Sequence, residues 1–232
     1  MKKYLPLKIF IGYDEIECIS WHTLVQSIIE KSAYPVAIIP LSLNNIKKIF
    51  TRQRDPKQSN DFSFSRFLVP YLSDYEGYSI FMDSDMLLRV DINSIFNEIY
   101  NQQNKAIYVV KHSYESKHTV KFLNSVQYSY PRKNWSSFIL WNCSHPSNNK
   151  VDLNFVNTAT GLELHRFTWL DDDEIGELDV NWNWLVGEYE GTEDNVKNVH
   201  WTIGGPYFKK YENTNFNSEW LYYKNKINFC KN

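Results

Sequence analysis

The sequence predicts a single α/β domain built on a central, mostly parallel β-sheet flanked by helices. Its 232 residues suffice for one large buried core, and 43% hydrophobic with 22% charged residues is an ordinary globular composition. The chain opens with an apolar strand, an amphipathic helix and a second apolar strand. Such a unit implies two parallel strands joined by a right-handed crossover.

The opening unit is defined by its hydrophobic periodicity. Residues 8–12 are an apolar run that ends at a glycine, which predicts a buried strand leaving through a turn. Apolar residues then recur at helical spacing from Trp21 to Ile29 and predict a helix near 15–31. Residues 36–41 predict the second strand.

The rest of the chain continues with alternating elements. Residues 51–61 are polar and predict a loop, and the short helix after it holds Arg66 before Pro70 disturbs it. A helix is predicted at 153–166, and the tail from Tyr207 shows no clear periodicity and is expected to wrap over the domain. Further strands are predicted at 79–82, 106–111, 136–141 and 196–201.

Charge and cysteine usage indicate a cytoplasmic protein. The net charge of −2 gives no global field that would attract nucleic acid or an anionic membrane. Cys18, Cys143 and Cys230 form neither a Cys-x-x-Cys pair nor a disulfide framework, which favours a reducing compartment. The start of the sequence meets Asp14 and Glu15 before any long apolar stretch, so no signal peptide or membrane span is expected.

Two carboxylates follow the strand predicted at 79–82, in the run Asp83-Ser84-Asp85. Burying unpaired carboxylates is costly, and their spacing in extended backbone puts both on one side of the strand. Each then raises the pKa of the other unless a cation lies between them, and ligands of α/β sheets gather at the carboxyl ends of strands. This pattern predicts a divalent metal site, although a turn-capping Asp83 beside a solvated Asp85 remains open as the alternative.

A second segment, residues 198–207, joins a strand to His200 and to the pair Gly204-Gly205. Glycines let backbone N–H groups approach a phosphate closely. An imidazole from His200 would complete a ligand set of two carboxylates and one nitrogen, which suits Mn²⁺ better than Mg²⁺. A lone histidine is more often structural, so the assignment of His200 depends on these neighbours.

Four further motifs lie in order along the chain. They are the polar turn Ile11-Gly12-Tyr13-Asp14, the R-x-x-x-P-x-L run 66–72, the strand 135–142 that ends in Asn142, and Asp171-Asp172-Asp173 followed by Trp182-Asn183. Together with the Asp-x-Asp and His200 segments, they resemble the GT-A class of glycosyltransferases, and specifically the family 8 type of glycogenin and bacterial galactosyltransferases. The likeness runs from about Lys8 to Tyr207 and suggests a divergent bacterial branch.

The resemblance implies a GT-A nucleotide-diphospho-sugar transferase fold and a Mn²⁺-dependent hexosyltransferase that uses a UDP-hexose with retention. The acceptor, whether a saccharide, a lipid-linked molecule or a protein, is not specified. About 8–110 would form the nucleotide- and metal-binding half, about 111–207 the acceptor half, and 208–232 a C-terminal tail. The implied residues are Asp83, Asp85 and His200 for the metal; Ile11, Gly12, Tyr13, Asp14, Ser84, Gly204 and Gly205 for the nucleotide; Ser136, Ser137 and Asn183 for the substrate; and Arg66, Asp172 and Asp173 for catalysis.

Some positions depart from the family pattern. The acceptor-side strand usually begins Asn-small-Gly, and its first two diagnostic residues are changed in Trp135-Ser136-Ser137. Asp172 stands where glutamine is usual. Gly205 stands where the family has a lysine that touches the diphosphate, so Lys209, Lys210 or backbone amides would have to replace that contact.

Three other classes of protein remain open. One is a metal-dependent phosphohydrolase, which would usually need more carboxylate and histidine ligands than the sequence offers. A sugar-nucleotide nucleotidyltransferase would share the sheet and the metal but would open with a glycine-rich basic phosphate loop, whereas residues 12–17 are acidic. A non-catalytic carbohydrate- or nucleotide-binding module would explain the missing lysine but would not need the two aspartates with the histidine.

Overall fold

A six-stranded sheet forms the centre of the protein. We describe it from a computed structural model that covers residues 5–55, 58, 60–102, 104–113, 132–189 and 193–227, so Cys230 and the end of the predicted tail lie outside it. The strand order is β2-β1-β3-β6-β5-β7. The bounds are β1 (Leu7–Gly12), β2 (Val36–Leu41), β3 (Tyr78–Met82), β5 (Ile107–Val109), β6 (Phe138–Asn142) and β7 (Ile175–Glu177).

The sheet is mostly parallel, as predicted. Strand β1 pairs in parallel with β2 and β3, and β5 pairs in parallel with β7. Strand β6 runs antiparallel to both of its neighbours, β3 and β5. The predicted α/β class, with a central mostly parallel sheet flanked by helices, is therefore confirmed.

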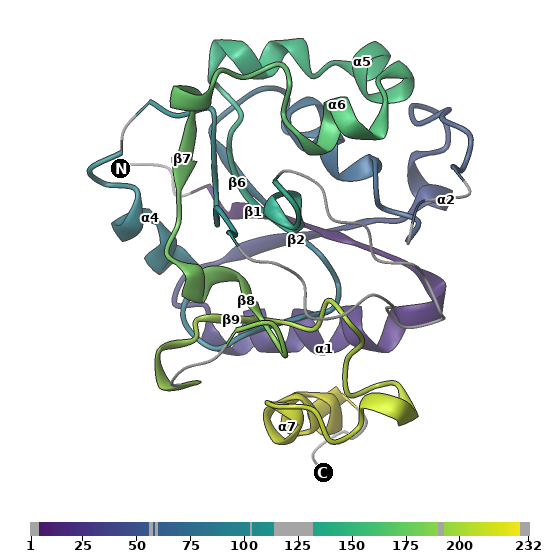
Figure 1. Cartoon of the computed structure of the whole chain (residues 1–232), viewed down its shortest axis with the longest axis vertical. Helices are drawn as coiled ribbons and strands as arrows, with labels where there is room; N and C mark the ends of the chain where they lie inside the picture. Colours follow the sequence, from purple (N-terminus) through teal and green to yellow (C-terminus); the bar gives the residue numbers. More distant parts are fainter. Residues whose placement is uncertain are drawn as a thin grey trace.

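Helices cover both faces of this sheet (Figure 1). Successive side chains of a strand point to opposite faces, so Ile9 and Ile11 of β1 pack in one core with Leu24 of α1 (Cys18–Lys31). Phe10 packs in a second core on the opposite face. That second face is covered by α2 (Leu43–Ile46), α3 (Val69–Leu72), α5 (Leu153–Thr158) and α6 (Gly161–His165), while α4 (Ile95–Glu98) contributes to the first.

A smaller sheet lies at the carboxyl ends of β1 and β3. It contains β4 (Met86–Leu88), β9 (Asn198–His200) and β8 (Trp184–Leu185), in the order β4-β9-β8. Strands β4 and β9 are antiparallel, and Met86 is opposite His200. The pairing brings the residue that follows the Asp-x-Asp run directly beside the histidine, although β4 and β8 are too short for hydrophobic periodicity to predict them.

The helix predicted at 153–166 is divided into α5 and α6. Thr160 begins the second helix with a capping box, in which its Oγ1 accepts from the N–H of Glu163 at 3.2 Å. The Glu163 carboxylate in turn accepts from the N–H of Thr160 at 2.7 Å. The division matters because it creates a second helix start, whose position is described below.

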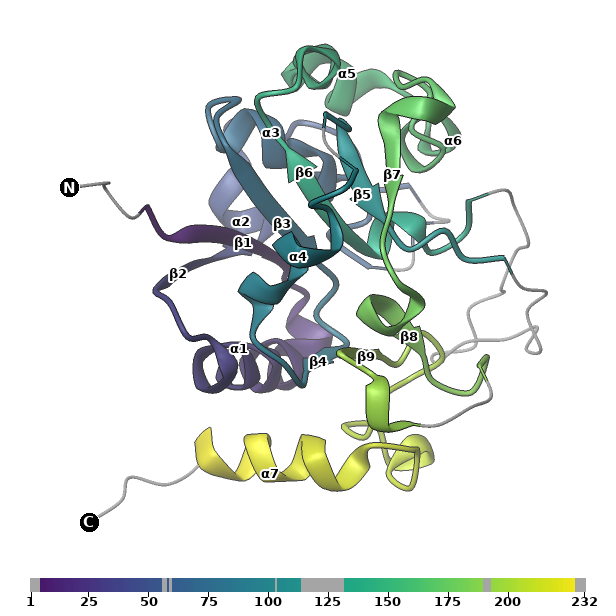
Figure 2. The ribbon, with the colours of Figure 1, turned by 90° about the vertical axis from the view of Figure 1, so that its left-hand side faces the viewer.

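The tail contains a helix that the sequence did not predict. Helix α7 (Asn217–Ile227) lies alongside α1, as Figure 2 shows. Phe216, Trp220 and Tyr223 are buried in a third apolar cluster together with residues of the small sheet, including Val199 and Trp201. The apolar residues of this tail are too sparse for a clear helical stripe, so the helix depends on tertiary packing.

Among the described residues, no helix has both the length and the apolar composition that crossing a membrane requires.

The docking of α7 is testable at Trp220, which is 3% exposed. Trp220→Ala should lower the free energy of unfolding by about 3 to 5 kcal/mol, because a large buried side chain leaves a cavity. Leu221→Ala, at a neighbouring position that is 42% exposed, should change it by less than about 0.5 kcal/mol. Urea unfolding of the two variants and the wild type measures both values, and equal effects would mean that α7 is not docked through Trp220.

Candidate active site

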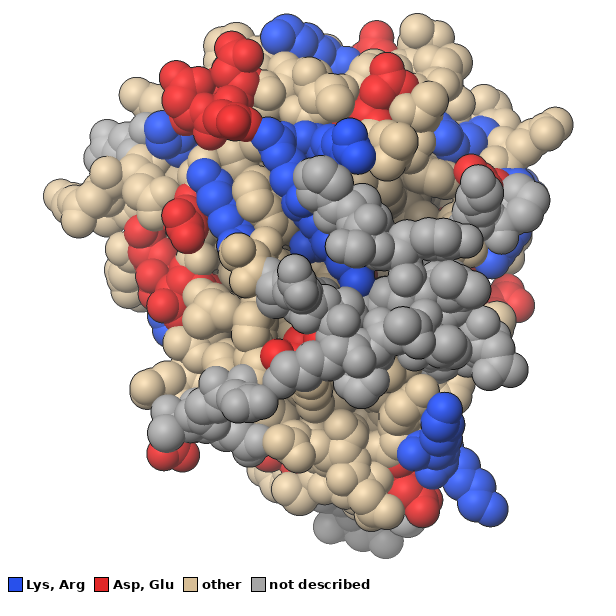
Figure 3. Space-filling model, in the orientation of Figure 1, with Lys and Arg blue, Asp and Glu red and all other residues tan. Residues whose placement is uncertain are grey.

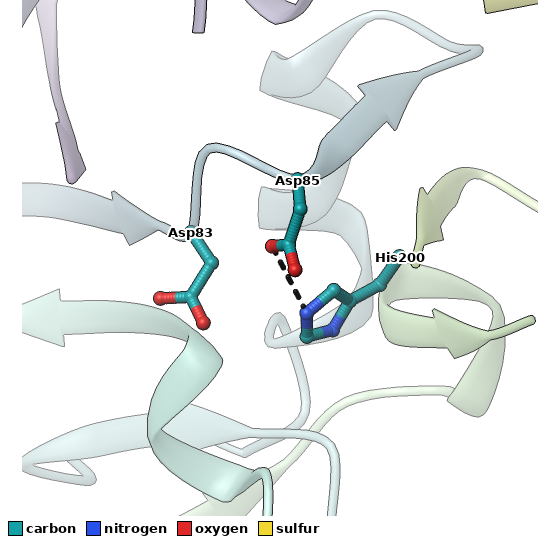
Figure 4. A group of neighbouring side chains, drawn as sticks. All are labelled: Asp83, Asp85 and His200. Atoms are coloured by element: carbon teal, nitrogen blue, oxygen red, sulfur yellow. Dashed lines mark ion pairs between the residues drawn. The ribbon is translucent and has the colours of Figure 1, made fainter. Parts of the chain in front are cut away.

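Three predicted metal ligands converge where the two sheets meet. Asp83 follows β3, Asp85 precedes β4 and His200 ends β9. One ligand atom from each residue lies within 4.8 Å of the other two, and Figure 4 shows that the three side chains point toward a common centre. Two residues adjacent in sequence to a buried strand and a third from far along the chain therefore form one group.

The backbone fixes this arrangement. The N–H of Asp83 donates to the carbonyl of Ser137 at 2.9 Å, which continues the central sheet beyond β3. The carbonyl of Asp85 accepts from the N–H of Trp201 at 3.0 Å, which starts the pairing of the small sheet. Ser84 between them is fully buried. The Asp-x-Asp run is thus a short covalent connection between the two sheets, from β3 to β4.

A buried arginine neutralises part of the negative charge. Arg66 is 4% exposed and its Nη1 lies 2.9 Å from a carboxylate oxygen of Asp83. The same nitrogen donates to the carbonyl of Ser136 at 2.8 Å, and the guanidinium lies over the ring of Phe81. A buried carboxylate needs such a partner because an unpaired charge in this environment is strongly unfavourable.

The chemistry of His200 and Asp85 fits a cation. The Nδ1 atom of His200 lies 2.8 Å from the amide oxygen of Asn183, which can only accept, so Nδ1 carries a proton. A ring that binds a cation through Nε2 carries its one proton on Nδ1. Nε2 then presents a lone pair to Oδ1 of Asp85 at 3.2 Å. That oxygen is buried and accepts no hydrogen bond from the described residues. Two facing lone-pair donors are stabilised by a divalent ion, and the mixed oxygen and nitrogen set suits Mn²⁺.

A third carboxylic acid lies beside this group. Glu17 is 6% exposed, and its carboxylate accepts from the hydroxyl of Tyr207 at 2.9 Å. Burial, and next to it the charge of Asp85, raises the pKa of Glu17 to about 8. Glu17 is therefore neutral near pH 7 beside Asp85, and a cation bound next to these side chains would favour its ionised form.

A cavity of about 370 Å³ opens beside the metal ligands. One end contains Glu17, Arg66, Asp83, Asp85, His200 and Thr202, and the other end contains the start of α6 and part of the 51–61 loop. Ser136 and Ser137 also line the cavity. The other lining residues are Asp55, Gln58, Asn60, Phe62, Ser63, Phe64, Asn134, Thr160, Gly161, Leu162 and His165.

Two lining residues that sequence reasoning missed have distinctive surroundings. Thr202 is 3% exposed, and its buried hydroxyl oxygen has no hydrogen-bond partner among the described residues. His165 Nδ1 lies 2.8 Å from the Ser136 hydroxyl. Burial, followed by the charges of Arg66 and Arg52, lowers the pKa of His165 to about 3, so this ring is neutral near pH 7. A single histidine or threonine gives no signal in a sequence without its spatial neighbours.

The predicted catalytic aspartates lie elsewhere. Asp172 and Asp173 are exposed in the 3₁₀ turn that precedes β7, and Asp172 pairs with Arg132. Strand β7 runs in the same direction as β3, so its start and the end of β3 are at opposite edges of the sheet. The helix start that lines the cavity is that of α6 instead. The acidic run resembles a functional helix start because acids are favoured at any such position, including a purely local cap.

The predicted turn after β1 is occupied by structural contacts. The carboxylate of Asp14 accepts from the N–H groups of Ile16 at 3.0 Å and Asp61 at 3.1 Å. A Cβ on Gly12 would lie 2.3 Å from the ring of Phe62, so packing alone requires glycine there. Among the described lining residues of the cavity, none of Ile11, Gly12, Tyr13 and Asp14 is present.

The predicted nucleotide glycines and Asn183 also face protein. Gly204 has a φ of 144°, and a Cβ there would lie 2.4 Å from the ring of Tyr211. Gly204, Gly205, Ser84 and Asn183 are buried and are not among the described lining residues. Asn183 contacts the candidate metal ligand His200 and is not among the described residues that line the cavity.

The fold and the Asp-Asp-His group define a glycosyltransferase fold of the GT-A type. Among solved structures, the chain is similar to the bifunctional glycosyltransferase WbbM in its apo form (TM-score 0.65, 14% identity, 94% of this chain and 49% of that one). It is also similar to GlyE of Streptococcus pneumoniae TIGR4 (TM-score 0.62, 11% identity, 95% and 60%). A third similar structure is the galactosyltransferase LgtC in complex with donor and acceptor sugar analogs (TM-score 0.56, 10% identity, 97% and 98%). The chain thus spans about half of the WbbM chain and 60% of the GlyE chain, and these likenesses concern the fold alone.

A curated relative identifies the family. The chain is 42% identical over 222 residues to Protein CDI of Arabidopsis thaliana, with 93% of this chain and 85% of the relative covered. The chain belongs to the family of that protein. No family model matches the chain. Because this relative is a plant protein, the expected bacterial branch is not confirmed.

The neutral state of His165 predicts a pH dependence of stability. Its pKa is about 3 in the folded protein, compared with 6.5 as the ordinary value. Between these values the unfolded chain binds a proton that the folded protein does not, so stability falls as the pH falls through this window. From pH 7 to pH 5, His165 should lower the free energy of unfolding by about 2 kcal/mol, measured by urea unfolding at both pH values.

His165→Gln removes the titrating ring, so its loss of stability between pH 7 and pH 5 should be smaller than that of the wild type by about 2 kcal/mol. His22→Gln, at an exposed position, is the matched control and should show the wild-type loss. The same loss in His165→Gln and the wild type would contradict the low pKa.

Proposed function

We propose that the protein is a metal-dependent glycosyltransferase that moves a hexose from UDP to a hydroxyl-bearing acceptor with retention. The observation that carries the proposal is the group formed by Asp83, Asp85 and His200 in the wall of a cavity, within a glycosyltransferase fold. The family 8 type, the UDP donor and retention follow from the sequence resemblance. The similar structure of LgtC with donor and acceptor sugar analogs supports a donor and an acceptor site in this fold.

Asp83, Asp85 and His200 would hold the divalent cation, with Mn²⁺ proposed because two oxygens and one nitrogen form the set. A cation bound there supplies Lewis-acid stabilisation of the negative charge on the departing diphosphate. Arg66 adds a second fixed positive charge, since its guanidinium lines the cavity and is held by Asp83 and by the Ser136 carbonyl.

The diphosphate needs a further donor because Gly205 replaces the lysine of the related family. Lys209 and Lys210 are exposed and are not among the described lining residues. Thr202 does line the cavity, two residues after His200, and its hydroxyl has no partner among the described residues. We therefore assign the phosphate contact to this hydroxyl. Lys and Arg side chains also gather on the upper half of the face in Figure 3, so the surroundings suit an anionic ligand despite the net charge of −2.

The far end of the cavity would hold the transferred sugar and the acceptor. It offers uncharged polar groups, among them Thr160, Asn60 and the neutral ring of His165, together with the carboxylate of Asp55. Such groups bind sugar hydroxyls through directional hydrogen bonds without the desolvation of a strong charge.

The cavity takes lining residues from both proposed halves, about 8–110 and about 111–207, and its metal ligand His200 comes from the second. A cytoplasmic setting suits the free thiols of Cys18 and Cys143.

A second candidate is a non-catalytic module that binds a sugar nucleotide. It is favoured by the position of Asp172 and Asp173 outside the described cavity lining and by the absent lysine. Binding without turnover distinguishes it from the enzyme.

The metal group is tested by the affinity for UDP. Isothermal titration should show that UDP binds the wild type at least about 100-fold more tightly with Mn²⁺ than without it, since a cation bridges the ligands and the diphosphate. Asp85→Asn should abolish this difference, because it removes one anionic ligand. Asp173→Asn, at an exposed position outside the described cavity lining, is the control and should bind like the wild type. Metal-independent binding of UDP to the wild type would refute the proposed metal group.

The donor and the stereochemistry are tested together. Incubation with Mn²⁺ and UDP-, GDP- or CDP-hexoses should give slow hydrolysis of the UDP donors, and NMR of the product should show the donor's anomer. Turnover restricted to GDP- or CDP-hexoses would overturn the donor assignment. Tight binding of UDP-hexoses with no turnover in the presence of candidate acceptors would favour the non-catalytic module.

A further inference from the structure

The amide of Asn183 lies directly behind the metal ligand His200. Asn183 is fully buried at the end of the 3₁₀ turn Val180–Asn183, and its Oδ1 is 2.8 Å from Nδ1 of His200. A histidine that binds a metal through one nitrogen usually donates the other N–H to a fixed acceptor, which sets the tautomer and the ring orientation. The question is what makes the amide oxygen, and not the amide nitrogen, face the ring.

A backbone carbonyl decides the direction of the amide. The carbonyl of Asn134 can only accept, and the hydroxyl of Ser137 donates to it at 2.7 Å. Because this donation uses the one proton of the hydroxyl, the Ser137 oxygen must accept from Nδ2 of Asn183, which is 2.9 Å away. The nitrogen of the amide is thereby held toward Ser137, and the oxygen is left toward His200.

The second N–H of the amide is also accounted for. Nδ2 of Asn183 lies 2.9 Å from Nε2 of His112, which accepts it if the proton of that ring is on Nδ1. In that tautomer, Nδ1 of His112 donates to the hydroxyl of Tyr189, which is 2.5 Å away. Every contact in the series from Asn134 to His200 then pairs a donor with an acceptor, and the reverse direction of the amide would break the contact with Ser137.

The opposite orientation of the Asn183 amide would prevent His200 from binding a metal. The amide nitrogen would donate to Nδ1 of His200, and the ring proton would move to Nε2. Nε2 would then donate to Oδ1 of Asp85, which lies 3.2 Å away, and the ring would have no lone pair left there for a cation. The orientation of one buried amide thus separates a metal-binding pair from a closed hydrogen-bonded pair.

We propose that Asn183 is a positioning residue that holds His200 in the tautomer competent to bind a metal, and that Ser137 and His112 fix the direction of its amide. This inference rests on the proposed metal-binding role of His200. It replaces the substrate roles that the sequence suggested for Asn183 and Ser137.

The test compares three variants with the wild type. Asn183→Leu keeps the size of the side chain but removes the acceptor, so Mn²⁺ affinity, measured by titration calorimetry without nucleotide, should fall about 10- to 100-fold. Asn183→Asp keeps an acceptor for Nδ1–H and should retain most of the affinity. Asn148→Leu is the matched control, since it removes another fully buried amide, which donates to the carbonyls of Ala106 and Asn142. It should bind Mn²⁺ like the wild type.

A second measurement does not depend on the metal. Nitrogen-15 NMR of the metal-free protein reports which ring nitrogen of His200 carries the proton. We expect Nδ1 in the wild type, in Asn148→Leu and in Asn183→Asp, and a change toward Nε2 in Asn183→Leu. An unchanged tautomer and an unchanged affinity in Asn183→Leu would overturn the positioning role. A wild type that does not bind Mn²⁺ would instead refute the proposed function.

Discussion

The connection between the two sheets is the constraint on which the rest of the site depends. Two backbone hydrogen bonds, from Asp83 to Ser137 and from Trp201 to Asp85, anchor the ends of a three-residue link to different sheets. The link cannot relax to separate its carboxylates without breaking one sheet or the other. Arg66 offsets part of the repulsion between them through its contact with Asp83, and a cation held between Asp85 and Nε2 of His200 would offset the rest.

Much of the fold and the centre of the site were predictable from local patterns. The strands β1, β2 and β3 are buried apolar runs with clear ends, and two carboxylates directly after such a run have few explanations other than a cation or a cap. A metal-binding role for His200 was predictable only because the residue lies at the end of a predicted strand and is followed by paired glycines. The pairing of Met86 with His200 then supplied what no local pattern contains, namely that the two segments are adjacent.

The differences between the predicted and the observed surroundings of the site residues share one physical cause. Asp172 and Asp173 carry a local signal, acids at the start of a turn, that is the same whether the turn faces a ligand or water. Asn183 was placed correctly near the site, but its partners come from three separate segments, and their donor and acceptor roles are defined only in three dimensions. Glu17 and His165 give no sequence signal, because burial and neighbouring charges produce their altered pKa values.

Helix α7 has a consequence for how the protein is made. The small sheet that carries Asp85 and His200 is too slight to be stable alone, and its apolar side is covered by Phe216, Trp220 and Tyr223. During synthesis, the strands of the large sheet, Asp83 and Asp85 therefore leave the ribosome first. His200 and the residues of α7 that cover the small sheet leave it later. The candidate metal group is therefore completed only after the segment from His200 to Tyr223 has been released, when the large sheet is already available to receive it.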